Sequence, residues 1–216
     1  MNRIIPTVFA TNRKEFDRRF KELIKVSEKI QIDIMDGKFV KAKSIDINDI
    51  PDLKKLKNIF EVHLMVKSPE KMIKILKDKG AKKIIFHYES YWNILKCISL
   101  ASEIKNLGME AWLALNPETS IAKISGFVSE FDGILLFGVH PGKEHQPLIA
   151  RTYRKIRELK GIDKNLKVQV DGGVNPNDVT KLGLYGADYL NSGSFVFNGK
   201  NPKKAIKELN DLMKSI

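Results

Sequence analysis

The chain contains one cysteine, no low-complexity segment and no apolar run long enough to cross a bilayer. One cysteine excludes an internal disulfide, and Cys97, beside Ile98 in a helical pattern, is predicted to be a packing residue. The N-terminal residues enter a predicted strand at once and lack the basic, apolar and cleavage regions of a signal peptide. We therefore expect a cytoplasmic protein that has no membrane partner.

Acidic residues are outnumbered by basic ones, and the net charge is +12. A protein that reads nucleic acid usually gathers its basic residues in a patch, often with stacking aromatic side chains. Here lysines alternate with acidic residues, as in Lys14-Glu15 and Lys207-Glu208, which is typical of solvated helix faces. The charge favours anionic ligands in general. We therefore expect no specific nucleic-acid partner.

Short apolar runs alternate with segments of helical periodicity, eight times along the chain. The predicted strands cover residues 3–8, 29–35, 60–66, 83–89, 110–116, 133–139, 166–171 and 188–193. The predicted helices cover residues 12–27, 49–57, 69–79, 92–107, 119–126, 146–160, 176–184 and 201–215. Near-continuous apolar strands between amphipathic helices indicate a parallel sheet covered by helices.

Eight such units in 216 residues favour an α/β fold, a (β/α)8 TIM barrel formed by residues 1–216 as a single domain. An open doubly wound sheet is a poorer fit, because residues 6–10 lack the glycine-rich fingerprint expected after its first strand. Polar residues stand before prolines at Ser68, Asn116, Asn175 and Asn201, and most of these positions are predicted to be helix N-caps.

Titratable residues collect at the carboxyl ends of the predicted strands, where barrel enzymes carry their chemistry. Asp33 and Asp171 each follow branched apolar residues, and a carboxylate buried at such a point needs a functional reason. Asp36 is better explained as a cap of the following turn. All four histidines lie in or just past strands on the same face: His63, His87, His140 and His145.

Two carboxylates and a histidine that converge from separate strands could hold a divalent metal, and the carboxylates could also transfer protons. The alternative is one structural metal or none, with both aspartates held by backbone donors. Glycine motifs after the last two strands, at Gly172-Gly173 and Gly193-Ser194, predict a phosphate site built from backbone N–H groups.

The order and spacing of eight segments resemble the ribulose-phosphate 3-epimerase family across nearly the whole chain. These segments are Pro6-Thr7, Asp33-Ile34-Met35-Asp36-Gly37-Lys38-Phe39-Val40, Val62-His63-Leu64-Met65, His87-Tyr88-Glu89, Ala114-Leu115-Asn116-Pro117, Pro141-Gly142, Val170-Asp171-Gly172-Gly173-Val174 and Ser192-Gly193-Ser194. The resemblance implies a TIM barrel that interconverts D-ribulose 5-phosphate and D-xylulose 5-phosphate, a step of carbohydrate metabolism, through a metal-stabilised enediolate.

The resemblance also implies roles for particular residues. Asp33 and Asp171 match the acid/base pair and, with His63, ligands of one divalent ion (zinc, iron, manganese or cobalt); Gln31 is a weaker candidate for the remaining ligand. Thr7 matches a position that offers a hydroxyl to the substrate. The expected substrate-binding residues are Thr7, Met35, His63, Met65, Gly142, Gly172, Gly173, Gly193 and Ser194. We also expect a homo-oligomer.

Several positions depart from the family pattern. Gln31 stands where the family has a histidine ligand, and Phe137 replaces a methionine. The loop Pro141-Gly142-Lys143-Glu144-His145-Gln146 replaces Pro-Gly-Phe-Gly-Gly-Gln, and Lys41-Ala42 replaces Pro-Asn. One hypothesis is that His140 or His145 compensates for Gln31.

Three functions fit these residues. The first is the epimerase described above, and the second is an epimerase of another ketose phosphate, such as a hexulose 6-phosphate. The third is a non-catalytic protein that binds a sugar phosphate. A decarboxylase of the related barrels is less favoured, because His63 stands where such enzymes carry an Asp-x-Lys-x-x-Asp motif.

Overall fold

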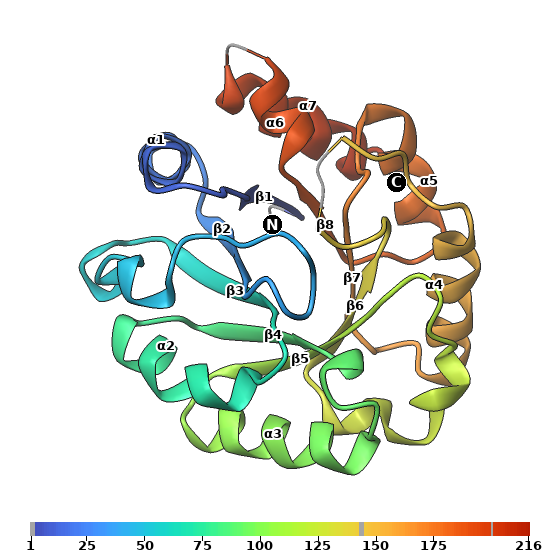
Figure 1. The fold of residues 1–216 in the computed structure, drawn as a ribbon. Coiled ribbons are helices and arrows are strands. Elements are labelled where there is room, and N and C mark those ends of the chain that lie inside the picture. The colour runs from blue at the N-terminus through green and yellow to red at the C-terminus, as the bar shows by residue number, and fades with distance from the viewer. Residues whose placement is uncertain (1–2, 143–144, 200) are drawn as a thin grey trace.

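Eight parallel strands close into a barrel in chain order in the computed structural model, which describes residues 3–142, 145–199 and 201–216. The predicted TIM barrel is therefore confirmed, and helices surround the strands on the outside (Figure 1). The strands are β1 (Ile4–Val8), β2 (Lys29–Met35), β3 (Ile59–Met65), β4 (Lys83–His87), β5 (Glu110–Leu115), β6 (Gly133–Phe137), β7 (Val168–Asp171) and β8 (Tyr189–Ser192).

Seven α-helices lie among the described residues. They are α1 (Arg13–Leu23), α2 (Ile73–Lys79), α3 (Ile94–Asn106), α4 (Arg151–Ile162), α5 (Pro176–Leu184), α6 (Ser194–Asn198) and α7 (Pro202–Lys214). The short helix α6, which follows β8, is additional to the eight predicted helices. None of these helices is long and apolar enough to cross a membrane.

Three predicted helices are wrong in type or extent. Residues 49–57 form two 3-10 turns, Ile47–Asp49 and Leu53–Lys55, because Pro51 lacks an N–H donor and keeps Ile50 extended. Residues 119–126 contain 3-10 helices at Ile121–Lys123 and Ser125–Glu130.

The third is residues 69–79, which begin as a 3-10 helix (Pro69–Met72) before α2. Two other helices start later than predicted. Helix α4 starts at Arg151, since Pro147 disfavours a helical conformation at the preceding residue. Helix α3 starts at Ile94 because Asn93 is its cap.

The capping predictions hold in part. Asn175 and Asn201 accept hydrogen bonds from backbone N–H groups in the first turns of α5 and α7. Ser68 makes no such bond, and Asn116 precedes no α-helix. Asp36 accepts from the backbone N–H groups of Lys38 and Phe39 at 2.8 Å each, so it caps its turn as expected. Cys97 is buried in the core, also as expected.

The interior of the barrel has an apolar part and a polar part. Alternate residues of each strand point inward, and Met35, Met65, Trp112 and Leu135 pack together there. The strand register places Asp33 beside His63 and, one layer lower, Gln31 beside Glu61. Buried polar side chains therefore extend from the carboxyl ends of the strands toward the opposite end of the barrel.

Candidate active site

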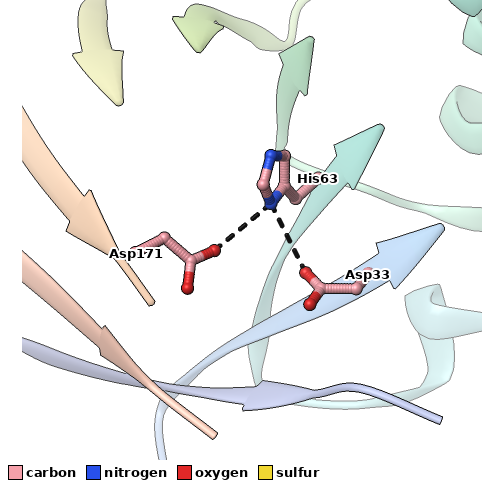
Figure 2. A group of neighbouring side chains, drawn as sticks. All are labelled: Asp33, His63 and Asp171. Carbon is pink, nitrogen blue, oxygen red and sulfur yellow. Dashed lines mark ion pairs between the residues drawn. The ribbon is translucent and has the colours of Figure 1, made fainter. Parts of the chain in front are cut away.

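Three buried ionisable side chains meet at the carboxyl ends of β2, β3 and β7. The Nδ1 atom of His63 lies 3.2 Å from Oδ2 of Asp171 and 3.5 Å from Oδ1 of Asp33. The two carboxylates approach the imidazole from different sides (Figure 2). The structure thus brings together the three residues that the sequence singled out as acid, base and ligand.

The electrostatics of this group favour bound protons. Burial raises the pKa of the Asp33 carboxyl to about 6, and the negative charge of Asp171 adds to this effect, against the opposing contact with His63. Burial alone would lower the pKa of His63, but the contacts with Asp171 and Asp33 outweigh it and raise that pKa to about 9. His63 is therefore an imidazolium at neutral pH when no metal is bound.

A second histidine supports His63 from behind. The Nε2 atoms of His63 and His87 lie 2.8 Å apart, and Nδ1 of His87 lies 3.2 Å from Oε2 of Glu89. Burial lowers the pKa of His87, so this ring is neutral. The only proton placement that serves both contacts has His63 Nε2–H donating to His87 and His87 Nδ1–H donating to Glu89. Nδ1 of His63 is then directed at the carboxylates.

These residues fit a divalent metal. Nδ1 of His63 is buried without a hydrogen-bond partner in the described part of the chain, between two carboxylate oxygens. Two ligand atoms bonded to a tetrahedral ion at about 2.1 Å are about 3.4 Å apart, which agrees with the observed separations. Asp33, His63 and Asp171 form the group of possible ligands in the described residues, and the group contains neither His140 nor His145.

The other two histidines lie farther out. His140 is exposed, with Nδ1 3.7 Å from Oε1 of Glu118. His145 is also exposed and lines the cavity in front of Asp33. The hypothesis that one of them completes the metal site finds no support in this geometry. Lys143 and Glu144, in the same rewritten loop, lie outside the described residues.

Gln31 contacts both catalytic candidates through its amide nitrogen. Its Nε2 donates to Oδ1 of Asp33 at 2.9 Å and to Oδ2 of Asp171 at 2.6 Å. Its Oε1 accepts from Nδ2 of Asn191 at 2.8 Å. The side chain is fully buried.

A cavity opens above the carboxylates. Of the expected substrate-binding residues, those that line it are Thr7, Met65, Gly142, Gly172, Gly173, Gly193 and Ser194. Met35 and His63 are not among its lining residues: Met35 packs in the barrel interior, and His63 lies fully buried behind the carboxylates. Phe9 and Val139 add apolar surface that was not predicted from the sequence.

The two glycines after Asp171 adopt conformations that favour glycine. Gly172 and Gly173 have φ angles of 92° and 75°. A Cβ atom on Gly173 would lie 2.6 Å from the backbone nitrogen of Leu148, so the loop after β6 packs directly on this turn. The turn therefore presents backbone rather than side chains to the cavity.

The buried polar residues without a role among the sequence-based predictions include Glu61, Lys83, Glu89, Gln169 and Asn191. The sequence contains a signal for two of them, Glu61 and Gln169. Glu61 and Gln169 precede His63 and Asp171 by two positions, as Gln31 precedes Asp33, so each points into the barrel one layer below an active-site residue. The partners that they find across the barrel depend on tertiary structure.

Comparison with known proteins identifies the family. Residues 3–197 match the Ribulose-phosphate 3 epimerase family. The ribulose-phosphate 3-epimerase of Schizosaccharomyces pombe is 31% identical over 219 residues, covering 99% of this chain and 95% of that protein. The Escherichia coli K12 ribulose-phosphate 3-epimerase is 32% identical, covering 88% and 85% respectively. The chain belongs to the ribulose-phosphate 3-epimerase family and is a sugar-phosphate epimerase, an isomerase that acts on carbohydrates.

Solved structures add support for the fold alone. A 3-hexulose-6-phosphate synthase superposes with a TM-score of 0.71 at 13% identity, covering 98% of this chain and 99% of that chain. The orotidine 5'-phosphate decarboxylase of Pyrococcus horikoshii OT3 superposes with a TM-score of 0.65 at 16% identity, over 99% and 100%. Barrels of this shape thus accompany different chemistries, and the function must be argued from the site.

Proposed function

We propose that this enzyme interconverts D-ribulose 5-phosphate and D-xylulose 5-phosphate by moving a proton at C3. The observation that carries the proposal is the convergence of Asp33 and Asp171 on His63, at a cavity that both carboxylates line. Two carboxylates from different strands can reach a carbon between them from different sides. The names of the relatives give ribulose phosphate and its carbon 3, and xylulose phosphate is the C3 epimer of ribulose phosphate.

Each aspartate would act once in every turnover. One carboxylate removes the C3 proton from one face, and the other, in its protonated form, delivers a proton to the opposite face and inverts the carbon. In the reverse direction the two aspartates exchange roles. In the metal-free site burial raises the pKa of Asp33 to about 6, so this environment tolerates the protonated carboxyl that the acid role requires.

Asp33, His63 and Asp171 would hold the metal, and one nitrogen and two oxygen donors fit the proposed zinc, iron, manganese or cobalt. When bound, a divalent ion supplies Lewis-acid stabilisation of the negative charge that develops on the substrate oxygens. His87 and Glu89 orient the His63 ring from behind.

The remaining cavity residues would bind and orient the sugar phosphate. The Oγ1 atom of Thr7 is buried and has no hydrogen-bond partner among the described residues, so it is available to a substrate hydroxyl. Met65 provides an apolar wall. The backbone N–H groups around Gly172, Gly173, Gly193 and Ser194 would hold the phosphate.

The test is epimerisation in D2O, followed by NMR of the C3 position with each of the two sugar phosphates as the starting compound. The unmodified enzyme should incorporate solvent deuterium at C3 and form both epimers. Asp33→Asn and Asp171→Asn should each lower the epimerisation rate by about 10²–10⁴-fold. Each should still exchange the C3 proton of only one epimer, and the two variants should differ in which one. Full epimerisation by either variant would contradict the proposed mechanism.

A second candidate keeps this chemistry and changes the ketose phosphate, for example to a hexulose 6-phosphate. His145 and Gln146 line the cavity, in the loop that departs from the family pattern. A panel of ketose phosphates compared by kcat/KM would separate the two candidates. Tight binding of every sugar phosphate without exchange of C3 protons would instead indicate a binding protein.

The cytoplasmic location and the homo-oligomer stay predictions. The lone buried thiol, Cys97, supports a reducing compartment. Cell fractionation and light scattering of the purified protein would test the two predictions separately.

A further inference from the structure

The amide oxygen of Gln31, the atom that could coordinate a metal, faces Asn191 rather than the carboxylates of Asp33 and Asp171 in the arrangement observed. Both N–H groups are directed at carboxylates, to Asp33 at 2.9 Å and Asp171 at 2.6 Å, and the oxygen accepts from Asn191 at 2.8 Å. A carboxylate oxygen that accepts one of these bonds retains a lone pair. The same oxygens of Asp33 and Asp171 that face Gln31 also face Nδ1 of His63.

The orientation of this amide is imposed by a chain of buried hydrogen bonds. Lys83 donates to Oε1 of Gln169 at 2.5 Å and forms an ion pair with Glu61 at 2.9 Å. Nε2 of Gln169 donates to Oε1 of Glu61 and to Oδ1 of Asn191, at 2.5 Å each. Nδ2 of Asn191 then donates to Gln31.

The two ends of this chain cannot change direction. An ammonium group only donates and a carboxylate only accepts, so Lys83 and Glu61 fix which end of each amide is oxygen and which is nitrogen. If the Gln31 amide turned over, its oxygen would face two carboxylates and its NH2 group would face the NH2 group of Asn191. To avoid that clash of like groups, Asn191 and Gln169 would have to turn as well, against Lys83 and Glu61.

We propose that Gln31 is a positioning residue, whose N–H groups hold the carboxylates of Asp33 and Asp171 in place, and that it is not a metal ligand. This proposal rests on the proposed function, in which those two carboxylates transfer the proton. Gln31 then differs in role from the histidine that the family carries at this position: it holds the two carboxylates by hydrogen bonds and does not coordinate the metal. The ion pair at the far end of the barrel interior then becomes part of the active-site framework.

Nuclear magnetic resonance of the glutamine side chains tests the orientation directly. The chain has only three glutamines, Gln31, Gln146 and Gln169, so ¹⁵N-glutamine labelling gives three amide pairs. The Gln31 pair is identified by its absence in Gln31→Leu. We expect both of its protons downfield and protected from solvent exchange, without metal and after Zn²⁺ is added. Loss of that protection on Zn²⁺ binding would overturn the proposal.

The visible spectrum of bound Co²⁺ gives a second readout that needs no substrate. In Gln31→Leu the Co²⁺ bands should stay unchanged in position and intensity, because the metal keeps the same donor atoms, even if the affinity falls by about 10–100-fold when two ligands lose the residue that orients them. If Gln31 were a ligand, the donor set would change and the bands would shift, which would overturn the proposal. If Gln31→Leu does not fold, sequential resonance assignment of the unmodified protein identifies the Gln31 pair, and the labelling experiment then decides the question alone.

Kinetics separate positioning from a merely structural effect. Gln31→Leu and Asn191→Leu should each lower kcat by about 10–100-fold with KM within about threefold, and the double variant should be no slower than the slower single variant. Additive losses of kcat in the double variant would contradict the proposal that Gln31 and Asn191 act through one connected chain of hydrogen bonds. A protein that bound Co²⁺ and protected Gln31 as expected, but did not epimerise ribulose 5-phosphate, would refute the proposed substrate and leave this inference standing.

Discussion

His63 and His87 lie with their Nε2 atoms 2.8 Å apart, although they come from different strands and both are fully buried. Two ring nitrogens at this distance require one donor and one acceptor. Glu89 lies 3.2 Å from Nδ1 of His87 and accepts the proton of that nitrogen, so Nε2 of His87 is the acceptor and Nε2 of His63 is the donor. A carboxylate therefore determines, through two imidazoles, that Nδ1 of His63 is the atom directed at Asp33 and Asp171.

The first prediction concerns the hydrogen bond by which His87 orients His63. His87→Leu should lower the affinity for Co²⁺ or Zn²⁺ by about 10–100-fold, because the ligand His63 loses the partner that sets its tautomer and orientation. Competition with a chelating dye would measure the change. His140→Leu is the matched control, since His140 is exposed and contacts Glu118, and it should leave the affinity unaltered. Equal affinities in all three proteins would show that His87 does not support the metal site.

The second prediction is a pH dependence of the stability of the metal-free protein. The pKa of His63 is raised from 6.5 to about 9 by the carboxylates, against the effect of burial, so the folded state binds this proton more tightly than the unfolded state. The stabilisation is complete below pH 6.5 and is lost as the pH rises through 9. The free energy of unfolding, from urea titrations without metal, should therefore fall across this window.

Two further measurements check the assignment to His63. In His63→Gln the stability should no longer decline between pH 6.5 and 9. In the unmodified protein, metal affinity should rise over the same window by up to about tenfold per pH unit, because binding displaces the His63 proton. A metal affinity independent of pH would contradict a protonated His63.

The third prediction concerns the turn after Asp171. Gly173→Ala should destabilise the protein by about 1–3 kcal/mol, because the φ angle of 75° is strained for alanine and the new Cβ would meet the backbone of Leu148. It should also raise KM for the sugar phosphate. Gly161→Ala, in α4, is the control: its new Cβ would meet no atom outside its own helix within 4 Å, and the change should be neutral or stabilising. Thermal unfolding and initial-rate kinetics of both variants would test this.

Much of the fold follows from local patterns. Strands such as β2 and β7 are recognisable as branched apolar runs that end near an aspartate, and the alternation with helices then defines the barrel. The short helices around Pro51 and Ile124 were mispredicted because a brief amphipathic pattern does not reveal 3-10 geometry.

Only the residues of the site at the carboxyl ends of the strands could be predicted from the sequence. Asp33, His63 and Asp171 were identifiable because each is out of place in its apolar strand. The direction of the Gln31 amide could not be predicted, because it depends on a hydrogen bond from Asn191, 160 positions away in the chain. An amide offers both a donor and an acceptor, so only its neighbours in space decide which one faces the carboxylates.

The fourth prediction concerns the far end of the barrel interior. Lys83→Met removes the cation of a buried pair, and Lys83 also lies over the ring of Trp112 at 3.5 Å. Glu61 would remain as a buried carboxylate without its counter-charge, and a loss of about 3–5 kcal/mol in the free energy of unfolding is expected. Lys207→Met breaks an exposed pair with Asp211 on α7 and should leave the free energy of unfolding almost unchanged.

The double variant Glu61→Gln/Lys83→Met separates charge from packing. It removes both members of the pair, so no unpaired charge stays buried, and it should be more stable than Lys83→Met alone. The amide oxygen introduced at position 61 can still accept a hydrogen bond from Gln169, which keeps one contact of the buried hydrogen-bond chain. If the double variant were instead as unstable as Lys83→Met, the loss would come from the packing of the lysine stem against Trp112, and the ion pair would have little part in the stability of the barrel.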